Sequence, residues 1–320
     1  MARVLLTGAT GFVGGRVAAR LTTLGHGVVA PVRRRNDHLD ALGAEQHLGG
    51  FEAVTPDLLG DVEVVVHAAA TAGPDLATAA AVNVEGTRRP LQAAVEARTP
   101  RFVHVSTTSV YADPGEDVRV VDEDAPLVAG DDEAASPYAR TKADADRLLL
   151  AEQGGPALAI LRPPAVLGAG PTSTWGTRVP GAIAEGRGFP APRARTFAFV
   201  HIDDLVDAIV AAGALETEGP EARTEAARGE PLVANVVGGH VTVGEYLDAV
   251  VELLDGDLPE RPGTDEAAWT GRYATDRLPR LLGVAPHRSF RAGMAEIAAA
   301  WAADPAGAPG SAPASREEPR

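Results

Sequence analysis

Short apolar runs alternate with longer amphipathic stretches along the first half of the chain. The apolar runs have the length and β-branched content of buried strands, and they lie near residues 3–7, 27–33, 63–68, 101–106 and 157–162, with helical patterns between them. Strands that alternate with helices in this way build a parallel sheet with right-handed crossovers. The pattern therefore predicts an α/β fold with a doubly wound parallel sheet.

From residue 163 onward the pattern is irregular, as expected of a smaller lobe built from several insertions. A strand and turn are expected at Val233–Gly239 and an amphipathic helix at 242–254, whereas the charged stretch 217–231 has the composition of a solvated loop. We expect a main domain at 1–162, a substrate lobe at 163–302 with segments that return to the main domain, and a disordered tail at 303–320.

Composition narrows the class of protein. The chain has 320 residues, a formal net charge of −15 and no cysteine. The charge argues against nonspecific nucleic-acid binding, and the missing cysteines exclude disulfides and thiolate metal sites. There is no apolar run of transmembrane length and no export signal, so we expect a cytoplasmic protein without a membrane partner.

A glycine-rich stretch, Thr7–Gly15, joins the first expected strand to a helical pattern at Arg16–Leu24. Gly8 would permit a tight turn, Gly11 would let the backbone approach a pyrophosphate, and Gly14 would let the helix pack closely on the strand. The helix amino terminus would offer free N–H groups and a positive dipole end to the phosphates. Because strand, glycine loop and helix follow one another, the motif indicates a dinucleotide site.

A tyrosine stands four residues before the only lysine, since the 29 basic residues are 28 arginines and Lys142. A chain so biased toward arginine is expected to keep a lysine where a compact ammonium is needed. On a helix, Tyr138 and Lys142 would share one face, and the ammonium would lower the pKa of the phenol, which suits proton transfer near neutral pH. Ser136 and Pro137 are expected at the cap and first turn of that helix. On a surface helix the same spacing would carry no chemistry.

The glycine loop followed far downstream by Tyr-x-x-x-Lys resembles the extended short-chain dehydrogenase/reductase family. Further segments match the family's landmarks in order, and the resemblance reaches to about residue 300: Val62–Ala70, Asn83–Thr87, Phe102–Tyr111, Arg162–Gly168 and Phe199–Leu205. The resemblance implies a Rossmann fold, a nicotinamide cofactor and a small-molecule substrate. It also implies a homodimer through helices near 80–98 and 138–152, which is the family's habit.

The resemblance implies roles for individual residues as well. Tyr138 would be the general acid, Lys142 would bind the nicotinamide ribose hydroxyls, and Thr107 would donate to the substrate oxygen. Ser106 and Thr108 are neighbours that could be confused with Thr107. Besides Tyr138 and Lys142, the expected cofactor contacts are Gly8, Thr10, Gly11, Phe12, Val13, Gly14, Arg33, Arg34, Ala68, Ala69, Asn83, Pro163 and Val166.

Departures from the family's pattern distinguish its branches. The second expected strand ends in arginines where NAD-preferring epimerases have an acidic residue. Arg33 and Arg34 suit a 2′-phosphate, so NADP(H) is favoured and NAD(H) is possible. Phe197 stands where nucleotide-sugar enzymes often have an arginine, and Pro164 where they often have an asparagine. The pattern is closest to the dihydroflavonol-reductase and hydroxysteroid-dehydrogenase branch.

The expected reaction is reduction of a ketone, or oxidation of a secondary alcohol, on a small natural-product-like molecule. Thr108 and Ser109 replace the Asp-Glu pair of 4,6-dehydratases, and two hydroxyls cannot perform that elimination. Candidate substrate contacts are Thr108, Ser109, Pro164, Trp175 and Phe197, while Phe189 and Phe199 could line a pocket or fill the lobe core. A nucleotide-sugar epimerase or 4-ketoreductase, and a non-catalytic dinucleotide sensor, are the alternatives.

Three histidines fall on or beside expected strands without the spacing of a metal motif, so structural roles and no metal site are expected: His67, His104 and His201. Asp203 and Asp204 are expected to cap a helix that begins near Leu205.

Overall fold

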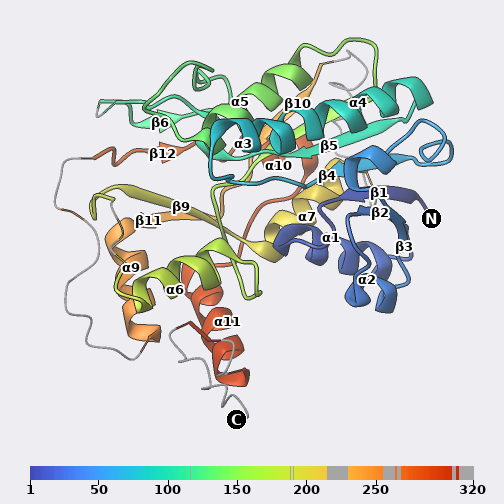
Figure 1. Ribbon diagram of the computed structural model, residues 1–320. Helices are drawn as coiled ribbons and strands as arrows, with labels where there is room; N and C mark the ends of the chain where they lie inside the picture. Colours follow the sequence, from blue (N-terminus) through green and yellow to red (C-terminus); the bar gives the residue numbers. More distant parts are fainter. Residues whose placement is uncertain are drawn as a thin grey trace.

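The structure is a computed structural model that describes residues 1–115, 117–187, 189, 191–214, 230–254, 264, 268–304 and 308–309. Its centre is a seven-stranded sheet in the order β10-β7-β5-β4-β1-β2-β3, and all neighbouring strands are parallel (Figure 1). The strands are β1 (Arg3–Thr7), β2 (Gly27–Val32), β3 (Glu45–Leu48), β4 (Val64–His67), β5 (Arg101–Val105), β7 (Ala157–Arg162) and β10 (Leu232–Asn235). The order runs outward from β1 in both directions, so the predicted doubly wound fold is confirmed.

Successive residues of the strands supply two separate cores. Val4 and Leu6 of β1 face one core, while Leu5, between them, faces the other. Helices α1 (Phe12–Thr23), α2 (Asp37–Ala41), α7 (Ile202–Ala212) and α10 (Arg277–Leu282) cover the first face, and α3 (Leu76–Asn83), α4 (Glu85–Ala97) and α5 (Pro137–Leu150) lie on the second. A strand buried on both faces needs an uninterrupted apolar run, which is the pattern found in the sequence.

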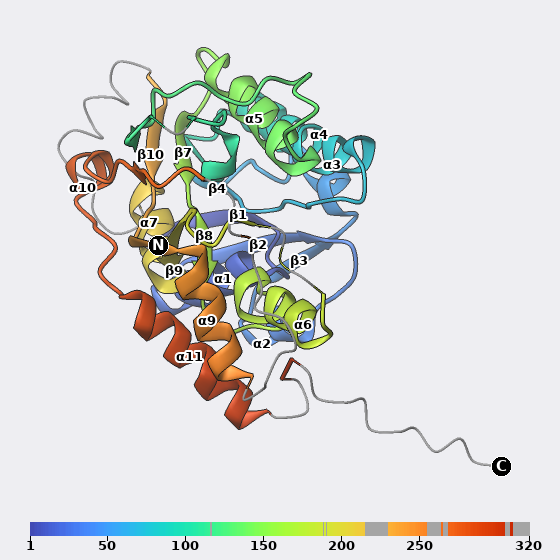
Figure 2. The ribbon, with the colours of Figure 1, turned by 90° about the vertical axis from the view of Figure 1, so that its left-hand side faces the viewer.

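A smaller lobe gathers on one side of the sheet, away from α3, α4 and α5 (Figures 1 and 2). Its own three-stranded sheet has the order β11-β9-β8. The lobe consists of β8 (Ala165–Leu167), η3 (Thr174–Arg178), α6 (Val179–Ala184), β9 (Thr196–His201), β11 (Gly239–Thr242), α9 (Val243–Leu253) and α11 (Phe290–Ala303). Its core is separate from the two cores of the main sheet and is rich in aromatic side chains.

A third, two-stranded sheet joins distant parts of the chain. It pairs β6 (Val120–Val121) with β12 (Arg272–Tyr273) in parallel. Two short 3₁₀ turns, η1 (Gly50–Ala53) and η2 (Thr108–Val110), follow β3 and β5. These elements place residues near 270 beside the segment that follows β5.

Most expected elements are confirmed to within a few residues. Ser136 caps α5 and Pro137 occupies its first turn, and α9 matches the helix expected at 242–254. The expected cap of α7 is wrong: the helix begins at Ile202, and the side chain of His201 accepts from the backbone N–H of Asp203. A ring nitrogen already fills the cap position, so both aspartates fall in the first turn.

Two expectations lie largely outside the described residues, namely the solvated loop at 217–231 and the tail at 303–320. Within the described part of the chain, no helix is both long and apolar enough to cross a membrane.

Candidate active site

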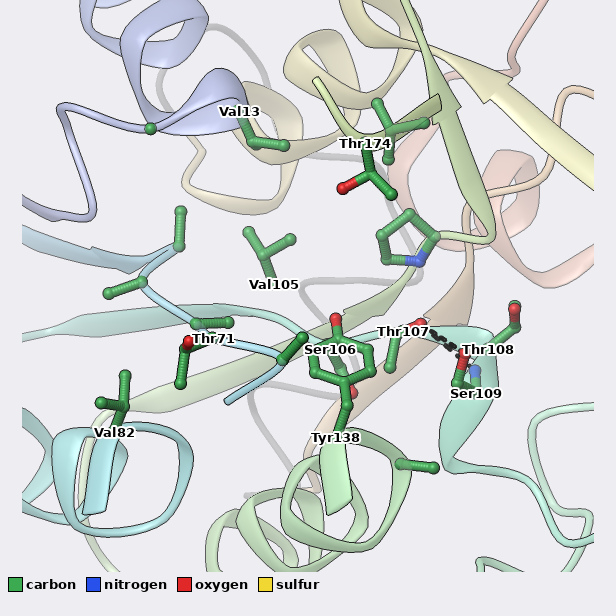
Figure 3. A pocket seen from close by; sticks show the side chains of 18 of the residues that line it. Val13, Thr71, Val82, Val105, Ser106, Thr107, Thr108, Ser109, Tyr138 and Thr174 are labelled. Atoms are coloured by element: carbon green, nitrogen blue, oxygen red, sulfur yellow. Dashed lines mark hydrogen bonds between the residues drawn. The ribbon is translucent and has the colours of Figure 1, made fainter. Parts of the chain in front are cut away.

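A pocket opens where the carboxyl ends of β1, β4, β5 and β7 meet the lobe, and part of it is shown in Figure 3. Its volume is about 1790 Å³. Single-ligand pockets usually measure roughly 300–1,000 Å³, so this one has room for a dinucleotide and a second molecule. Ligands of doubly wound sheets bind at this edge, because the loops that follow the strands converge there.

The glycine loop after β1 is packed too closely for side chains. Gly8 has a φ of +72°, and a Cβ on it would lie 2.7 Å from the backbone nitrogen of Ala69. A Cβ on Gly14 would lie 2.1 Å from the carbonyl oxygen of Gly8, so this helix position must also be glycine. The expected reasons for Gly8 and Gly14 are therefore visible as backbone-to-backbone contacts.

The loop leaves the amino terminus of α1 open toward the pocket. Gly11 is the N-cap residue, and no side chain caps the helix. Thr10, Phe12 and Val13 line the pocket together with Gly8, Gly11 and Gly14, and the backbone at Ala68 and Ala69 forms the opposite wall. Uncapped N–H groups and a bare glycine surface fit a pyrophosphate, so these residues would hold a dinucleotide.

The end of β2 presents a cation to the same pocket. Arg33 lines the pocket with its stem against Gly50, where a Cβ would lie 3.3 Å from the Arg33 Cγ, whereas Arg34 is not among the lining residues. Pro31, Val32 and Arg33 line the pocket at this strand end, and the adjoining lining runs through Gly50 to Glu52.

Tyr138 lies in the first turn of α5, and its ring points into the pocket toward Thr107 (Figure 3). The Ser136 hydroxyl accepts from the Ala139 N–H at 3.1 Å, which fixes the start of the helix. Burial raises the pKa of Tyr138, and a hydrogen bond from the Thr107 hydroxyl lowers it less. The pKa of Tyr138 is thus raised, and not lowered by Lys142 as expected from the sequence, so Tyr138 is a protonated phenol at neutral pH with a hydroxyl partner beside it.

Lys142 lies one helical turn further along and is 1% exposed, beneath the lining of the pocket. Its ammonium donates to the Val105 carbonyl oxygen and contacts His104 Nε2, both at 2.9 Å. Burial lowers the pKa of Lys142 to about 8, although the charge of Asp146 raises it. Two of its three N–H groups are therefore committed to the protein, and Lys142 is not among the lining residues.

Two stacked imidazoles stand behind the lysine. The rings of His67 and His104 are 5.3 Å apart and nearly parallel. Thr87 Oγ1 donates to the Asn83 carbonyl oxygen at 2.7 Å, so it accepts from His67 Nε2 at 3.0 Å, and Thr7 Oγ1 donates to His67 Nδ1 at 2.8 Å.

Both rings are neutral in this environment. Burial and the charge of Lys142 lower the pKa of His67 to about 3, and the same causes hold the pKa of His104 well below its usual range. His104 Nε2 therefore accepts from Lys142. The structural roles expected for these two histidines are thus visible in the contacts.

A buried ion pair fixes α5 against the sheet. Arg162 Nε donates to Asp146 Oδ2 at 2.9 Å, and both side chains are almost fully buried. Arg162 also donates to the Tyr111 hydroxyl at 3.1 Å and to the Glu123 carbonyl oxygen at 3.0 Å. Removing one partner of such a pair would leave an uncompensated charge in the core, so the helix that carries Tyr138 is held firmly.

The structure brings most of the sequence-predicted residues together around one pocket. Pro163, Pro164 and Val166 line it after β7, and Thr107, Thr108 and Ser109 line it after β5. Asn83 is fully buried below the lining, where it exchanges hydrogen bonds of 2.9 Å with the backbone of Thr71. Its position supports the loop after β4 rather than facing the pocket.

Aromatic side chains from both the main sheet domain and the lobe line the pocket. Nine of the fourteen aromatic residues of the chain line the pocket: Phe12, Phe51, Tyr111, Tyr138, Trp175, Phe189, Phe197, Trp269 and Tyr273. Phe197 is 5% exposed and stacks on Tyr246 at 4.5 Å, so it belongs to the lobe core as much as to the pocket wall. Phe199 packs on Phe290 in the lobe core and is not among the lining residues.

One acidic cluster has the donor atoms of a cation site. Ligand atoms of His201, Asp203 and Glu296 lie within 4.8 Å of one another. Arg16 already donates to Glu296 at 2.7 Å and to Asp203 at 3.4 Å, and His201 Nε2 lies 2.9 Å from Glu296. The cluster is therefore neutralised by a guanidinium and joins α1 to α7 and α11.

Several lining residues were not identified from the sequence, notably Arg89, Arg178, Arg195, Trp269 and Tyr273. Trp269 and Tyr273 come from a segment more than 130 residues after Tyr138. No local motif marks them, because they are brought to the pocket by long-range contacts: the pairing of β12 with β6 and hydrogen bonds to Thr196.

Comparison with known proteins agrees with this geometry. The sequence profile of the NAD dependent epimerase/dehydratase family matches residues 4–224. A 3-diazoavenalumate denitrifying reductase from Streptomyces sp. is 31% identical over 91% of this chain and 99% of its own length.

Two further proteins show partial or structural likeness. A 4-hydroxy-2-methyl-3-oxo-4-farnesyl-3,4-dihydroquinoline-1-oxide ketoreductase from Stigmatella aurantiaca is 35% identical over 53% of this chain, and the match spans about half of the ketoreductase's length, 52%. The solved structure of MoeE5 in complex with UDP-glucose and NAD has a TM-score of 0.73, at 24% identity over 93% of this chain and 97% of that one, which shows the shared fold. The chain belongs to the NAD dependent epimerase/dehydratase family of extended short-chain dehydrogenase/reductases, and it is an oxidoreductase that uses a nicotinamide dinucleotide.

Proposed function

We propose that the protein is an NADP(H)-dependent reductase that transfers hydride to a carbonyl carbon of a small natural-product-like molecule. The observation that carries this proposal is the Thr107–Tyr138 hydroxyl pair, which faces the pocket, with Lys142 four residues after Tyr138 on α5. A bound nicotinamide would supply the hydride. The reverse reaction, oxidation of a secondary alcohol, would use the same groups.

The residues of the chain would perform the proton chemistry. Thr107 would donate to the carbonyl oxygen and hold it beside Tyr138, which would deliver its proton as negative charge develops on that oxygen. The ammonium of Lys142 would stabilise the resulting phenolate, since it is fixed on the same helix face by His104 and Val105. Thr108 and Ser109 follow Thr107, so this turn lacks the carboxyl pair that water elimination would require.

The cofactor preference is proposed from the end of β2. Arg33 would bind the 2′-phosphate of NADP(H), whereas NAD(H) would present no phosphate to this guanidinium. We expect NADPH to bind at least about ten times more tightly than NADH, because each charge-assisted hydrogen bond is worth roughly 1.5–3 kcal/mol. In Arg33→Ala this gap should close, while Arg34→Ala, outside the lining, should keep it. Equal dissociation constants in the wild-type protein would contradict the preference.

The substrate class is proposed from the lobe. Phe197 stands where nucleotide-sugar enzymes often have a cation, and its stacking on Tyr246 leaves no place for one. Two relatives are a ketoreductase and a denitrifying reductase. A screen of NADPH oxidation against a panel of aromatic and polyketide-like ketones, with nucleotide sugars as the second panel, tests the proposal directly. Turnover confined to the ketone panel is expected.

Epimerisation of a nucleotide sugar is the second candidate, because Arg178 and Arg195 both line the pocket and could meet a diphosphate. We expect no saturable binding of UDP-glucose below millimolar concentration, since a buried diphosphate with incomplete charge partners costs several kcal/mol. Tight UDP-glucose binding by calorimetry would put the epimerase first.

A homodimer through α3, α4 and α5 is also proposed. These helices carry three of the few large exposed hydrophobic side chains, Leu76, Val95 and Leu150. Light scattering at micromolar concentration should give twice the chain mass, and a Val95→Asp, Leu150→Asp double variant should give the monomer mass.

A further inference from the structure

A segment from the carboxyl-terminal part of the chain forms one wall of the pocket. The Trp269 carbonyl oxygen accepts from the Thr196 N–H at 3.0 Å, and the Gly271 carbonyl oxygen accepts from the Thr196 hydroxyl at 2.6 Å. The Tyr273 N–H donates to His240 Nε2 at 3.0 Å. The wall is therefore fastened to the start of β9 and to β11, while β12 fastens it to β6.

The Tyr273 ring stands in an aromatic cluster with its hydroxyl toward the turn after β5. It stacks on Tyr111 at 5.9 Å and meets the edge of Trp269 at 5.3 Å. Its hydroxyl shares a hydrogen bond with Thr108, the neighbour of Thr107, and burial raises the pKa of Tyr273 so that it stays protonated. The turn thus holds two threonine–tyrosine pairs, Thr107 with Tyr138 and Thr108 with Tyr273.

A cation lies on the same side of the pocket. Arg195 directly precedes Thr196, lines the pocket, is close enough for its charge to act on Tyr273, and has no ion-pair partner among the described residues. By contrast, Arg187 pairs with Glu185 and Arg193 pairs with Asp248, both at 2.7 Å. Arg195 is exposed and lines the pocket, so its guanidinium is available to an anionic ligand group in a chain whose net charge is −15.

We propose that Arg195, Tyr273 and Thr108 form a subsite for a carboxylate carried by a planar, conjugated substrate. The guanidinium fork matches the two oxygens of a carboxylate, and the shared hydroxyl pair keeps one O–H free to donate. The aromatic walls at Trp269 and Tyr273 suit a flat conjugated body better than a sugar ring. This proposal rests on the proposed function, in which Thr107 and Tyr138 receive the reacting group.

The subsite would set the direction in which the substrate lies. With its carboxylate held by Arg195 and the Tyr273–Thr108 hydroxyl pair, the conjugated body would lie against the aromatic wall, with its reacting group at Thr107. The neighbouring positions of Thr107 and Thr108 then place the reacting atom and the anchoring group on adjacent hydroxyls. Arg195 and Tyr273 are therefore specificity residues, and they take no part in moving the proton.

Calorimetry on the NADP⁺-saturated protein tests the subsite without any turnover. The probes are benzoate, cinnamate and 4-hydroxycinnamate, each with its methyl ester, and UDP-glucose. We expect at least one acid to bind about ten times or more tightly than its ester, which has the same ring system without the charge. Arg195→Ala should remove this preference, and Tyr273→Phe should reduce it about threefold or more.

Arg187→Ala is the matched control, because Arg187 pairs with Glu185 and is not among the lining residues. The control should keep the full preference for the acid, and circular dichroism should show that all three variants are folded. Equal binding of acids and esters, no binding of any acid, or a preference that survives Arg195→Ala would overturn the proposal. UDP-glucose binding that depends on Arg195 would overturn the carboxylate assignment in favour of a diphosphate.

This test separates the subsite from the reaction. If the acids bind through Arg195 and no ketone or conjugated acid is reduced by NADPH, the subsite stands and the proposed function fails. If ketones are reduced and the esters bind as well as the acids, the function stands and the subsite fails.

Discussion

The two halves of the pocket are built on different principles. The cofactor half consists mainly of backbone: Gly8, Gly14 and the strand end at Ala69 approach so closely that a single added Cβ would collide with main-chain atoms. The substrate half consists mainly of side chains that arrive from η3, β9 and the segment around Tyr273. The cofactor half suits one fixed ligand, the dinucleotide. The substrate half can be adapted to different substrates by replacing single side chains.

The two residues proposed for proton transfer, Thr107 and Tyr138, lie between the two halves of the pocket. Thr107 comes from the main sheet and Tyr138 from α5, and neither depends on the lobe for its position. Variation in the lobe can therefore change the substrate without disturbing the acid. The following predictions test this separation, beginning with the largest expected effect.

Replacing Tyr138 should abolish proton transfer without disturbing either half of the pocket. Tyr138→Phe removes the hydroxyl while keeping the ring, so turnover of any substrate found in the ketone panel should fall by roughly 10²–10⁴-fold. NADPH affinity, measured by fluorescence titration, should change less than about twofold. Lys142→Arg should fail similarly, because a guanidinium is bulkier and cannot fit between His104 and Val105. A variant that kept a tenth of the wild-type rate would refute the proton-donor role.

A single methyl group added to the glycine loop should disrupt the cofactor half of the pocket. In Gly14→Ala the Cβ would lie 2.1 Å from the Gly8 carbonyl oxygen, so we expect a loss of about 1–3 kcal/mol or more in the free energy of unfolding and a loss of NADPH binding. Gly15→Ala is the matched control, since its Cβ would lie 3.6 Å from the Ala9 carbonyl oxygen, an ordinary contact. Thermal melts with and without NADPH measure both effects, and equal behaviour of the two variants would contradict the backbone argument.

The alkaline limb of the pH profile should report on Lys142. Its pKa is lowered to about 8, so the charged ammonium, and activity with it, should be lost as the pH rises through that value. His104→Leu removes an acceptor of the ammonium, which disfavours the charged form and should move the limb down by about one pH unit, the equivalent of 1.36 kcal/mol. The groups facing the lysine also include Asp146 and His67.

His104→Gln, which restores an acceptor, should bring the limb back toward the wild-type position. Loss of stability alone would lower activity at every pH and leave the limb where it was, so the pH profile distinguishes the two causes.

The smallest effect is expected at Ser109. Its hydroxyl lies 3.3 Å from Thr107 Oγ1 and makes only a weak hydrogen bond. Ser109→Ala should therefore keep kcat within about threefold of the wild-type value. A loss of a hundredfold would mean that this hydroxyl acts on the substrate, and the distinction from an eliminating enzyme would have to be reconsidered.

The same contrast explains how much could be predicted from the sequence. Strand β1, the glycine loop and the Tyr138–Lys142 helix are local patterns, so each was predicted close to its observed position. The cap of α7 was not, because His201 resembles a strand residue and only its ring nitrogen reveals the role.

Long-range pairing limited the rest of the prediction. The short strand β12, with only two residues, has no periodicity to detect, yet it brings Tyr273 to Thr108. Asn83 was expected at the cofactor, but whether its amide faces the pocket or supports the loop at Thr71 depends on packing that no motif records. Arg33 and Arg34 are equivalent in the sequence, and only the structure distinguishes them, since Arg33 lines the pocket and Arg34 does not.

Because Lys142 is the only lysine, its chemical labelling can report transient opening of the structure around the pocket. Amine acylation requires a neutral amine, and with a pKa of about 8 a substantial share of Lys142 would be in that form under mildly alkaline conditions. The reagent cannot reach Lys142 in the closed structure, because only 1% of its surface is exposed. The rate at which a succinimidyl ester labels the peptide containing residue 142 would therefore measure how often local opening exposes Lys142 to the reagent. Dinucleotide binding should slow that labelling, with no engineered probe and no background from other lysines in this chain.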